Sequence, residues 1–195
     1  WGWSALTHAI FQGHAGVVKV LVVDPRVDVG EPDRRGRSPL MHAAILGHVE
    51  VVHVLLADRR VDVNARNRGM RTVSMDEGDR THQASFEALH TDLPVNYRTP
   101  REDGWTALIC ASFNGQAEVT RILLGGGADP NIRCKEGKTA IIYAFTSALY
   151  PPSNWIEESV DSRRKGCLEC IDILLAQPGI DLREFEQIRC PEAGS

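Results

Sequence analysis

Two cysteines three residues apart, Cys167 and Cys170, have the spacing of a redox motif or of half a zinc site. A structural zinc ion needs four ligands, and the sequence has no second Cys or His pair at ligand spacing. A cysteine without such partners behaves as a small hydrophobic residue. We therefore expect no metal here and interpret both thiols as part of a packed helix.

The other patterns that carry chemistry are also incomplete. Gly125-Gly126-Gly127 has the composition of a phosphate loop but lacks the following lysine, and it comes directly after an apolar helical segment. It is therefore interpreted as the stop signal of that helix. The sequence contains no nucleophile elbow, no zinc-protease motif and no dinucleotide fingerprint. We expect neither a catalytic site nor a cofactor.

The composition limits the classes of binding partner and the cellular compartment that we expect. The net charge of -4 at pH 7 and a pI near 6.0 give no general cationic field for nucleic acid. No apolar run reaches the roughly 20 residues that span a bilayer. Five cysteines is an odd number and no leader precedes the first helix, so we expect an intracellular, cytoplasmic or nuclear protein. Trp1 already lies within a structural repeat, which suggests a segment of something larger.

The chain repeats itself, and residues 36–67 are its most regular stretch: GRSPLMHAAILGHVEVVHVLLADRRVDVNARN. A Gly-x-Ser-Pro start leads into a small-residue helix, a Gly-His turn, a second apolar helix and an extended exit. The same order starts again at Gly2, Gly104 and Gly137. Successive starts lie about 33 residues apart, or twice that distance between Gly36 and Gly104.

This order of parts resembles the ankyrin repeat. The resemblance implies an all-α solenoid of helix-turn-helix units joined by β-turn loops, called fingers below. It divides the chain into a single domain, 1–195, with repeats at about 2–35, 36–68, 104–136 and 137–187. Insertions at 69–103 and 148–165 interrupt it.

Aligning the repeats accounts for several residues that would otherwise suggest chemistry. Cys170 falls at the interior helix position of Val17, Val51 and Val119, and Cys167 falls where His14 and His48 fall. His8 and His42 share another repeat position. Three further histidines have no obvious partner and are interpreted as helix-surface or loop residues: His53, His82 and His90.

Within the first repeat, Ser4 is placed to cap the first helix. The second helix carries an apolar stripe, Val17, Val18, Val20 and Leu21, which we expect to be buried against neighbouring helices. Ankyrin repeats usually carry a bridging histidine in a Thr-Pro-Leu-His motif, and here that position is held by Thr7, Met41, Ile109 and Ile142. We therefore expect apolar packing to replace the usual polar bridges between repeats.

The segment 69–103 admits two interpretations. It is either a long insertion at the finger between the second and third repeats, with a short helix over residues 82–90, or a decayed repeat that has lost its first helix. In the fourth repeat, Pro151-Pro152 stops the first helix. The turn glycine is then delayed to Gly166, and the second helix is expected at Cys167–Ala176.

The ankyrin resemblance also implies a concave partner groove, formed by the fingers and the first helices. Carried over position by position, it places Trp3, Arg37, Trp105 and Lys138 in the groove, followed by Phe11 and Gln12, Ile45 and Leu46, Phe113 and Asn114, and Thr146 and Ser147. Arginines at the finger tips extend the surface: Arg34, Arg35 and Arg66. Trp and Arg are enriched at binding hot spots. The alternative is structural, with Trp3 and Phe11 covering the N-terminal end and Trp105 and Phe113 packing under the 69–103 segment.

The expected function is a non-catalytic module that binds a protein partner in this groove, acting as a monomer. Two alternatives stay open. In the first, the repeats form a regulatory segment acting in cis within a larger enzyme or membrane channel. An enzyme hidden in the insertions is the third possibility, although neither insertion supplies a nucleophile with a positioned base.

Overall fold

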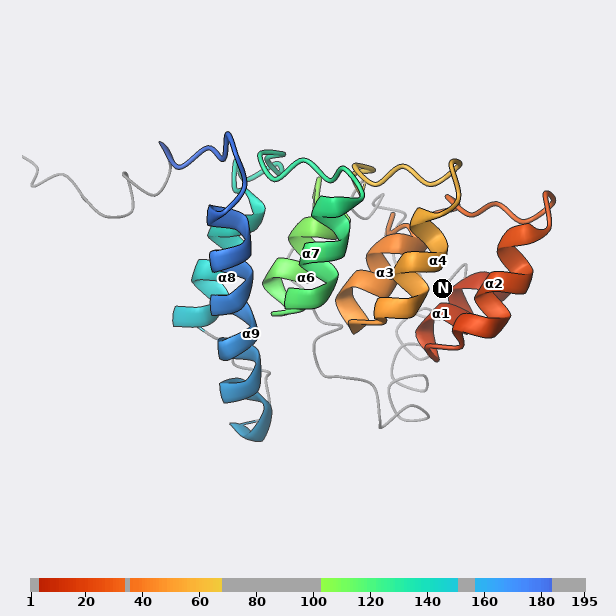
Figure 1. The fold of residues 1–195 in the computed structure, drawn as a ribbon, viewed down its shortest axis with the longest axis horizontal. Helices are drawn as coiled ribbons and strands as arrows, with labels where there is room; N and C mark the ends of the chain where they lie inside the picture. The colour runs from red at the N-terminus through yellow and green to blue at the C-terminus, as the bar shows by residue number, and fades with distance from the viewer. Residues whose placement is uncertain (1–3, 34–35, 68–102, 151–156, 184–195) are drawn as a thin grey trace, which may run out of the picture.

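The computed structural model describes residues 4–33, 36–67, 103–150 and 157–183. Within these ranges the regular elements are all helices, arranged as four pairs in a row (Figure 1). The pairs are α1 (Ala5–Phe11) with α2 (Ala15–Val23), α3 (Pro39–Leu46) with α4 (Val49–Leu56), α6 (Ala107–Phe113) with α7 (Ala117–Gly125), and α8 (Ala140–Leu149) with α9 (Glu157–Leu175). The expected all-α solenoid of helix pairs is confirmed.

Short side chains that accept hydrogen bonds start the first helices. Ser4, Ser38 and Thr106 each accept a hydrogen bond from the backbone N–H three residues later. These bonds satisfy donors that a helix start leaves unpaired, which is why Ser and Thr recur just before each first helix. The predicted cap at Ser4 is confirmed. The second helix α7 ends at Gly125. Gly127, two residues later, has a φ of 88°, in the left-handed region that favours glycine.

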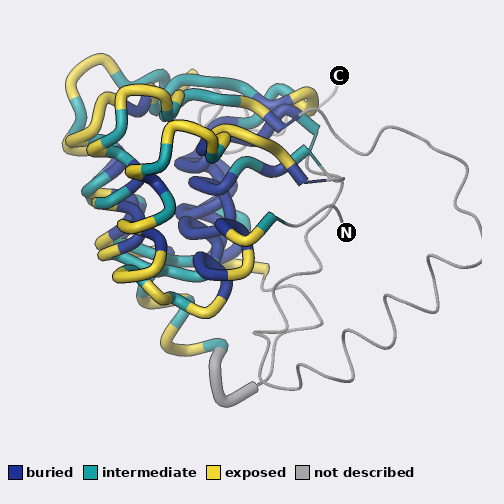
Figure 2. Tube along the Cα trace, turned by 90° about the vertical axis from the view of Figure 1, so that its right-hand side faces the viewer, coloured by how far each residue is buried: buried dark blue, intermediate teal, exposed yellow. Residues whose placement is uncertain are grey.

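The core runs continuously through the row. First helices pack on the first helices of the next repeat, α1 on α3, α3 on α6 and α6 on α8, and second helices follow the same order. Figure 2 shows the first helices almost fully buried, whereas the second helices expose one side. Because α3 and α4 pack directly on α6 and α7, the second and third repeats are neighbours in space. The short helix predicted at 82–90 lies outside the described residues.

The last repeat differs from the sequence expectation. Helix α9 begins at Glu157 rather than Cys167, and it extends beyond the lower ends of the other helices (Figure 1). Gly166 is therefore inside a helix and not in a turn. A Cβ at Gly166 would collide with the carbonyl oxygen of Gly115, so glycine is needed here for close backbone approach to the third repeat.

The apolar stripe of α2 is only half buried, which corrects a second expectation. Val18 is fully buried and Leu21 partly so, but Val17 and Val20 are exposed. Among the helices that the structure describes, α2 packs closely on α1 and α4, which leaves its other side without a closely packed helix from this set.

Candidate functional site

Of the residues predicted to line the groove, three lie outside the described residues: Trp3, Arg34 and Arg35. Seven of the others are buried, so their expected exposure was wrong: Phe11, Arg37, Ile45, Trp105, Phe113, Asn114 and Ser147. Leu46 is partly exposed and Arg66 is exposed. The groove face of the first helices is therefore not a row of open aromatic side chains.

Trp105 is buried because it belongs to an aromatic cluster that joins the third and fourth repeats. Its side chain is 0% exposed. The ring centroid of Trp105 lies 5.2 Å from that of Phe113 and 4.5 Å from that of Tyr143. The indole Nε1–H donates to the Tyr143 hydroxyl at 3.2 Å. Edge-to-face contacts and a satisfied indole N–H are features of a packed core.

Tyr143, on α8, is the residue of this cluster that sequence reasoning missed. Its hydroxyl also lies 3.3 Å from Cys134 Sγ and donates to Glu136 Oε2 at 3.4 Å. Burial and the neighbouring Cys134 raise the pKa of Tyr143 far above its ordinary value, so the phenol stays neutral. The sequence offered one signal that could have identified it, the large size of the tyrosine side chain. Tyr143 occupies the repeat position of His8, His42 and Cys110, on the inner side of a first helix.

Arg37 is held within a buried polar cluster at the finger between the first two repeats. Its backbone N–H donates to Asp33 Oδ1 at 2.9 Å, and His42 Nε2 lies 3.2 Å from Asp33 Oδ2. Burial alone raises the pKa of Asp33. The hydrogen bond and charge of His42 and the amide and charge of Arg37 outweigh that effect and leave the pKa below its ordinary value. Repeat alignment did not predict this pair, because His8 at the same position is exposed.

Arg66 is the predicted arginine that remains at the surface, and it links two fingers. Its guanidinium donates to the backbone carbonyl of Arg133 at 2.9 Å. Arg133, at the same repeat position, pairs with Asp181 at 2.8 Å in the next exit loop. Arg183 and Arg133 hold the pKa of Asp181 well below its ordinary value. The finger edge is thus a connected row of polar groups rather than a set of independent side chains.

Hydrogen bonds also cross between repeats from the repeat position that directly follows Gly47, Gly115 and Gly166. His48 Nε2 lies 3.3 Å from the carbonyl oxygen of Phe11, and Gln116 Nε2 donates to that of Ile45 at 3.3 Å. Cys167 Sγ lies 3.8 Å from the carbonyl oxygen of Phe113. These contacts explain why Phe11 and Ile45 are buried: the next repeat overlaps the C-terminal turn of their helix. Polar bridging between repeats persists, at another position than the family's usual histidine.

The exit loops carry a third set of bridges, centred on asparagines. Asn64 donates to the carbonyl of Gly127 at 3.3 Å and accepts from the N–H of Asp129 at 2.9 Å. Asn131 makes the equivalent pair, donating to Gly179 at 2.9 Å and accepting from Asp181 at 2.7 Å. An amide that both donates and accepts fixes the separation of two loops, so these residues set the spacing of the fingers.

The finger of the second repeat closes at its base across residues 68–102. The N–H of Asn67 donates to the carbonyl of Trp105 at 2.9 Å, and the N–H of Gly104 donates to the carbonyl of Asn67 at 3.1 Å. Asp33 makes the same two bonds, with Arg37 and Gly36, at 2.9 and 2.8 Å. The two ends of the intervening segment therefore meet at the finger edge.

The Cys167 and Cys170 thiols are buried on the inner side of α9. Burial is the main reason that the pKa of Cys167 rises to about 12 and that of Cys170 to about 11. Thiols with such pKa values stay protonated at neutral pH and are poor nucleophiles and poor metal ligands. Within the described ranges no three His, Cys, Asp or Glu side chains gather as a metal site would require. None of the helices described there has the length and hydropathy of a membrane span.

Two known proteins match short stretches of this chain. Protein HOS4 of Saccharomyces cerevisiae is 40% identical over 57 residues, 29% of this chain and 5% of that protein. The human DNA-binding protein RFXANK is 49% identical over 47 residues, 24% of this chain and 18% of its own length. The chain thus matches only a small part of the length of either relative.

The family model for ankyrin repeats in three copies matches residues 1–67 and 80–151, more than half of the chain. Four helix pairs stacked in a row and joined by hydrogen-bonded fingers agree with that match, as do the Ser or Thr caps on three of the first helices. Ankyrin repeats generally mediate protein–protein interaction. The chain belongs to the ankyrin-repeat family.

Proposed function

We propose that this chain is a non-catalytic protein-binding module whose partner contacts the finger edge and the adjoining concave side of the first helices. The observation that carries the proposal is the finger edge itself. Exposed charged groups lie along it, and asparagine and arginine bridges fix their spacing in three successive loops. A surface with fixed spacing loses little conformational entropy on binding.

The proposed contact residues divide into two groups. Arg66 and Leu46 retain exposed surface, as do Gln12 at the repeat position of Leu46 and Lys138 at that of Arg37, and these would touch a partner directly. The buried members of the predicted set, such as Trp105 and Arg37, would act by holding the fingers and first helices in place. Trp3, Arg34 and Arg35 remain part of the proposal as finger positions implied by the ankyrin resemblance.

We further propose that 69–103 is an insertion at a finger rather than a decayed repeat, within one domain covering 1–195. The direct packing of α3 on α6 supports this proposal, as does the closed finger base at Asn67. An insertion at this place starts and ends on the finger edge. It would therefore adjoin the proposed partner surface.

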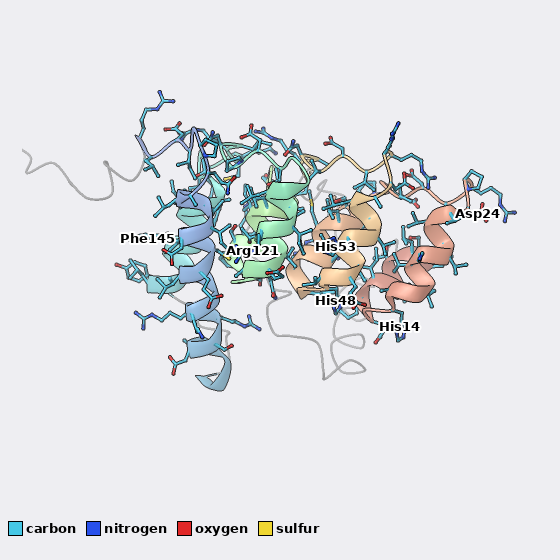
Figure 3. The ribbon with its side chains drawn as sticks, in the orientation of Figure 1. His14, Asp24, His48, His53, Arg121 and Phe145 are labelled. Atoms are coloured by element: carbon cyan, nitrogen blue, oxygen red, sulfur yellow. The ribbon has the colours of Figure 1, made fainter. Side chains whose placement is uncertain are left out.

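Charge reversal on opposite sides of the stack tests the proposal. The variant Arg66→Glu with Lys138→Glu alters the finger edge and the first-helix side. Its matched control, Lys19→Glu with Arg121→Glu, makes the same change in net charge on the exposed sides of α2 and α7, where Figure 3 labels Arg121. Both variants should fold, as judged by helical circular dichroism. Only the first should lose the proteins that the wild-type chain captures from a native lysate.

A cis regulatory role is the second candidate. The observation that favours it is the small share of each relative that the chain matches, 5% and 18%, which is typical of a module within a longer protein. In that case the finger edge would bind another domain of the same polypeptide. Affinity of the isolated chain for the separately produced flanking domains, lost in Arg66→Glu with Lys138→Glu, distinguishes this role from binding in trans.

We also propose that the module acts as a monomer inside the cell. The support is indirect: an odd number of cysteines, four of which are free and buried where the structure describes them. A reducing compartment preserves such thiols. Sedimentation equilibrium and localisation of a tagged natural protein test the two statements.

A further inference from the structure

The N-terminal side of the first repeat exposes positions that the other repeats bury. Val17 is 50% exposed, whereas Val51, Val119 and Cys170 at the same position are 1%, 1% and 0% exposed. Val20 is 73% exposed, whereas its equivalents Val54, Ile122 and Ile173 are partly buried. In the later repeats the second helix packs on the preceding second helix, and Cys170 Sγ lies 3.4 Å from Thr120 Oγ1 on α7.

The first helix shows the same contrast. Ala5 is exposed, but the residues at its position in later repeats are buried: Pro39, Ala107 and Ala140. His8 is exposed, and its equivalents are also buried: His42, Cys110 and Tyr143. Ala5, His8, Val17 and Val20 therefore form one surface, the N-terminal face, spanning α1 and α2.

Two polar residues beside this face, His14 and Arg26, differ from their equivalents, which bond to backbone carbonyls of the preceding repeat. His14 precedes α2 as His48 precedes α4, at the same level of the stack (Figure 3). His48 contacts the Phe11 carbonyl of the preceding repeat, and Gln116 contacts that of Ile45. Arg60 reaches back to the carbonyls of Val22 and Val27 at 2.6 and 3.1 Å, whereas Arg26 in the first repeat bonds to Asp24 two residues away.

The chemistry of the face is that of an internal repeat and not of a cap. A terminal repeat of a solenoid needs a polar outer surface. Here Ala5, Val17 and Val20 are apolar, and Gly16 stands where the later second helices carry Glu50, Glu118 and Glu169. A contiguous exposed apolar surface of this kind marks a contact site.

We propose that the N-terminal face is the docking site of another ankyrin-type helix pair, which precedes the first repeat in the same polypeptide. Its first helix would end with a carbonyl that accepts from His14, as Ile45 accepts from Gln116. Its second helix would cover Val17 and Val20 and offer carbonyls to Arg26. The three interfaces already present between repeats continue directly into this one. The small share of each relative that the chain matches supports a source in cis.

Cysteine labelling at two neighbouring positions tests this inference. Val17→Cys reports on the covered position. Lys19→Cys is the matched control, because its equivalents His53, Arg121 and Asp172 are exposed in every later repeat. Each variant is made in the 195-residue chain and in the natural polypeptide extended beyond Trp1. The maleimide reaction at position 17 should be at least tenfold slower in the natural polypeptide, with the rate at position 19 unchanged.

A fused chain supplies the reference for a covered face. A second copy of residues 36–68, placed ahead of Trp1, leaves two residues between Asn67 and Gly2, as between Asp33 and Gly36. Val17→Cys should be protected in this fusion. Equal labelling rates at position 17 in the chain, the fusion and the natural polypeptide would overturn the inference. So would reversible dimerisation of the 195-residue chain that Val17→Lys abolishes, since the occupant would then be a second copy.

Discussion

The side-chain oxygen of Asn67 accepts a hydrogen bond from the backbone N–H of Trp105 at 2.8 Å, although the two residues are 38 positions apart in the sequence. Asp33 and Arg37 make the same contact at 2.9 Å across an ordinary finger. The geometry of the finger base is thus independent of the number of residues in the segment that it closes. That independence lets a long segment adjoin the finger edge without separating the second and third repeats.

Deleting residues 69–102 leaves two residues, Arg68 and Asp103, between Asn67 and Gly104, as between Asp33 and Gly36, and should leave the stack folded. The free energy of unfolding should stay the same or rise, because closing a shorter loop costs less entropy, by roughly 1–2 kcal/mol. Urea denaturation followed by circular dichroism measures this. A shortened chain that unfolds at much lower urea would instead favour a decayed repeat that contributes packing.

Trp105→Ala should destabilise the chain by about 3–5 kcal/mol, because it removes a fully buried indole and its contacts with Phe113 and Tyr143. Leu46→Ala, at a partly exposed groove position, should cost about 1 kcal/mol or less. Denaturant midpoints of the two variants provide the comparison. Similar small costs would mean that Trp105 is as exposed as the ankyrin resemblance implied.

Asp33→Asn should reduce the acid sensitivity of folding. The pKa of Asp33 is below its ordinary value of 3.8 in the folded chain, so its ionised form stabilises the fold above that pH. This contribution is lost as the pH falls below about 3.8 toward the folded pKa. Asparagine keeps the acceptor for the Arg37 amide, as Asn67 does for Trp105.

The measurement is the difference in unfolding free energy between wild type and Asp33→Asn from pH 7 to pH 3. The excess in unfolding free energy of wild type over Asp33→Asn should be constant near neutral pH and shrink below about pH 4. An advantage that grows on acidification would contradict the assigned charge of the Asp33–His42 pair.

Asn131→Ala should loosen the fourth repeat. The substitution removes one hydrogen bond to Gly179 and one from Asp181, with an expected cost of about 1–3 kcal/mol. Amide hydrogen exchange in α9 should accelerate more than exchange in α3, because the two bonds join the last two repeats only. Uniform acceleration across the stack would show that the bridge is not local.

Sequence alone predicted the elements whose causes are local. The cap at Ser4 and the stop at Gly125 follow from residue type and position, and repeat periodicity supplied the helix pairs. Burial of Trp105 was not predictable in this way, because it depends on Tyr143, one repeat further on. The same holds for Asp33, whose partner His42 shares a repeat position with the exposed His8.

The extent of α9 was missed for a similar reason. Pro151 and Pro152 correctly indicate that the first helix of the last repeat stops, but they say nothing about where the next helix starts. The repeat pattern predicts a turn at Gly166 because glycine occupies that turn in the other repeats. Its close approach to Gly115 is a tertiary contact, and it explains the glycine equally well.

The central claim is that a protein partner binds along the finger edge and the concave side of the stack. Quantitative capture from native lysate with wild type, Arg66→Glu with Lys138→Glu, and Lys19→Glu with Arg121→Glu tests it most directly. We predict that the finger-edge variant loses the captured partner at least tenfold while the outer-helix variant retains it. Equal capture by all three folded proteins, or loss confined to the outer-helix variant, would contradict the account.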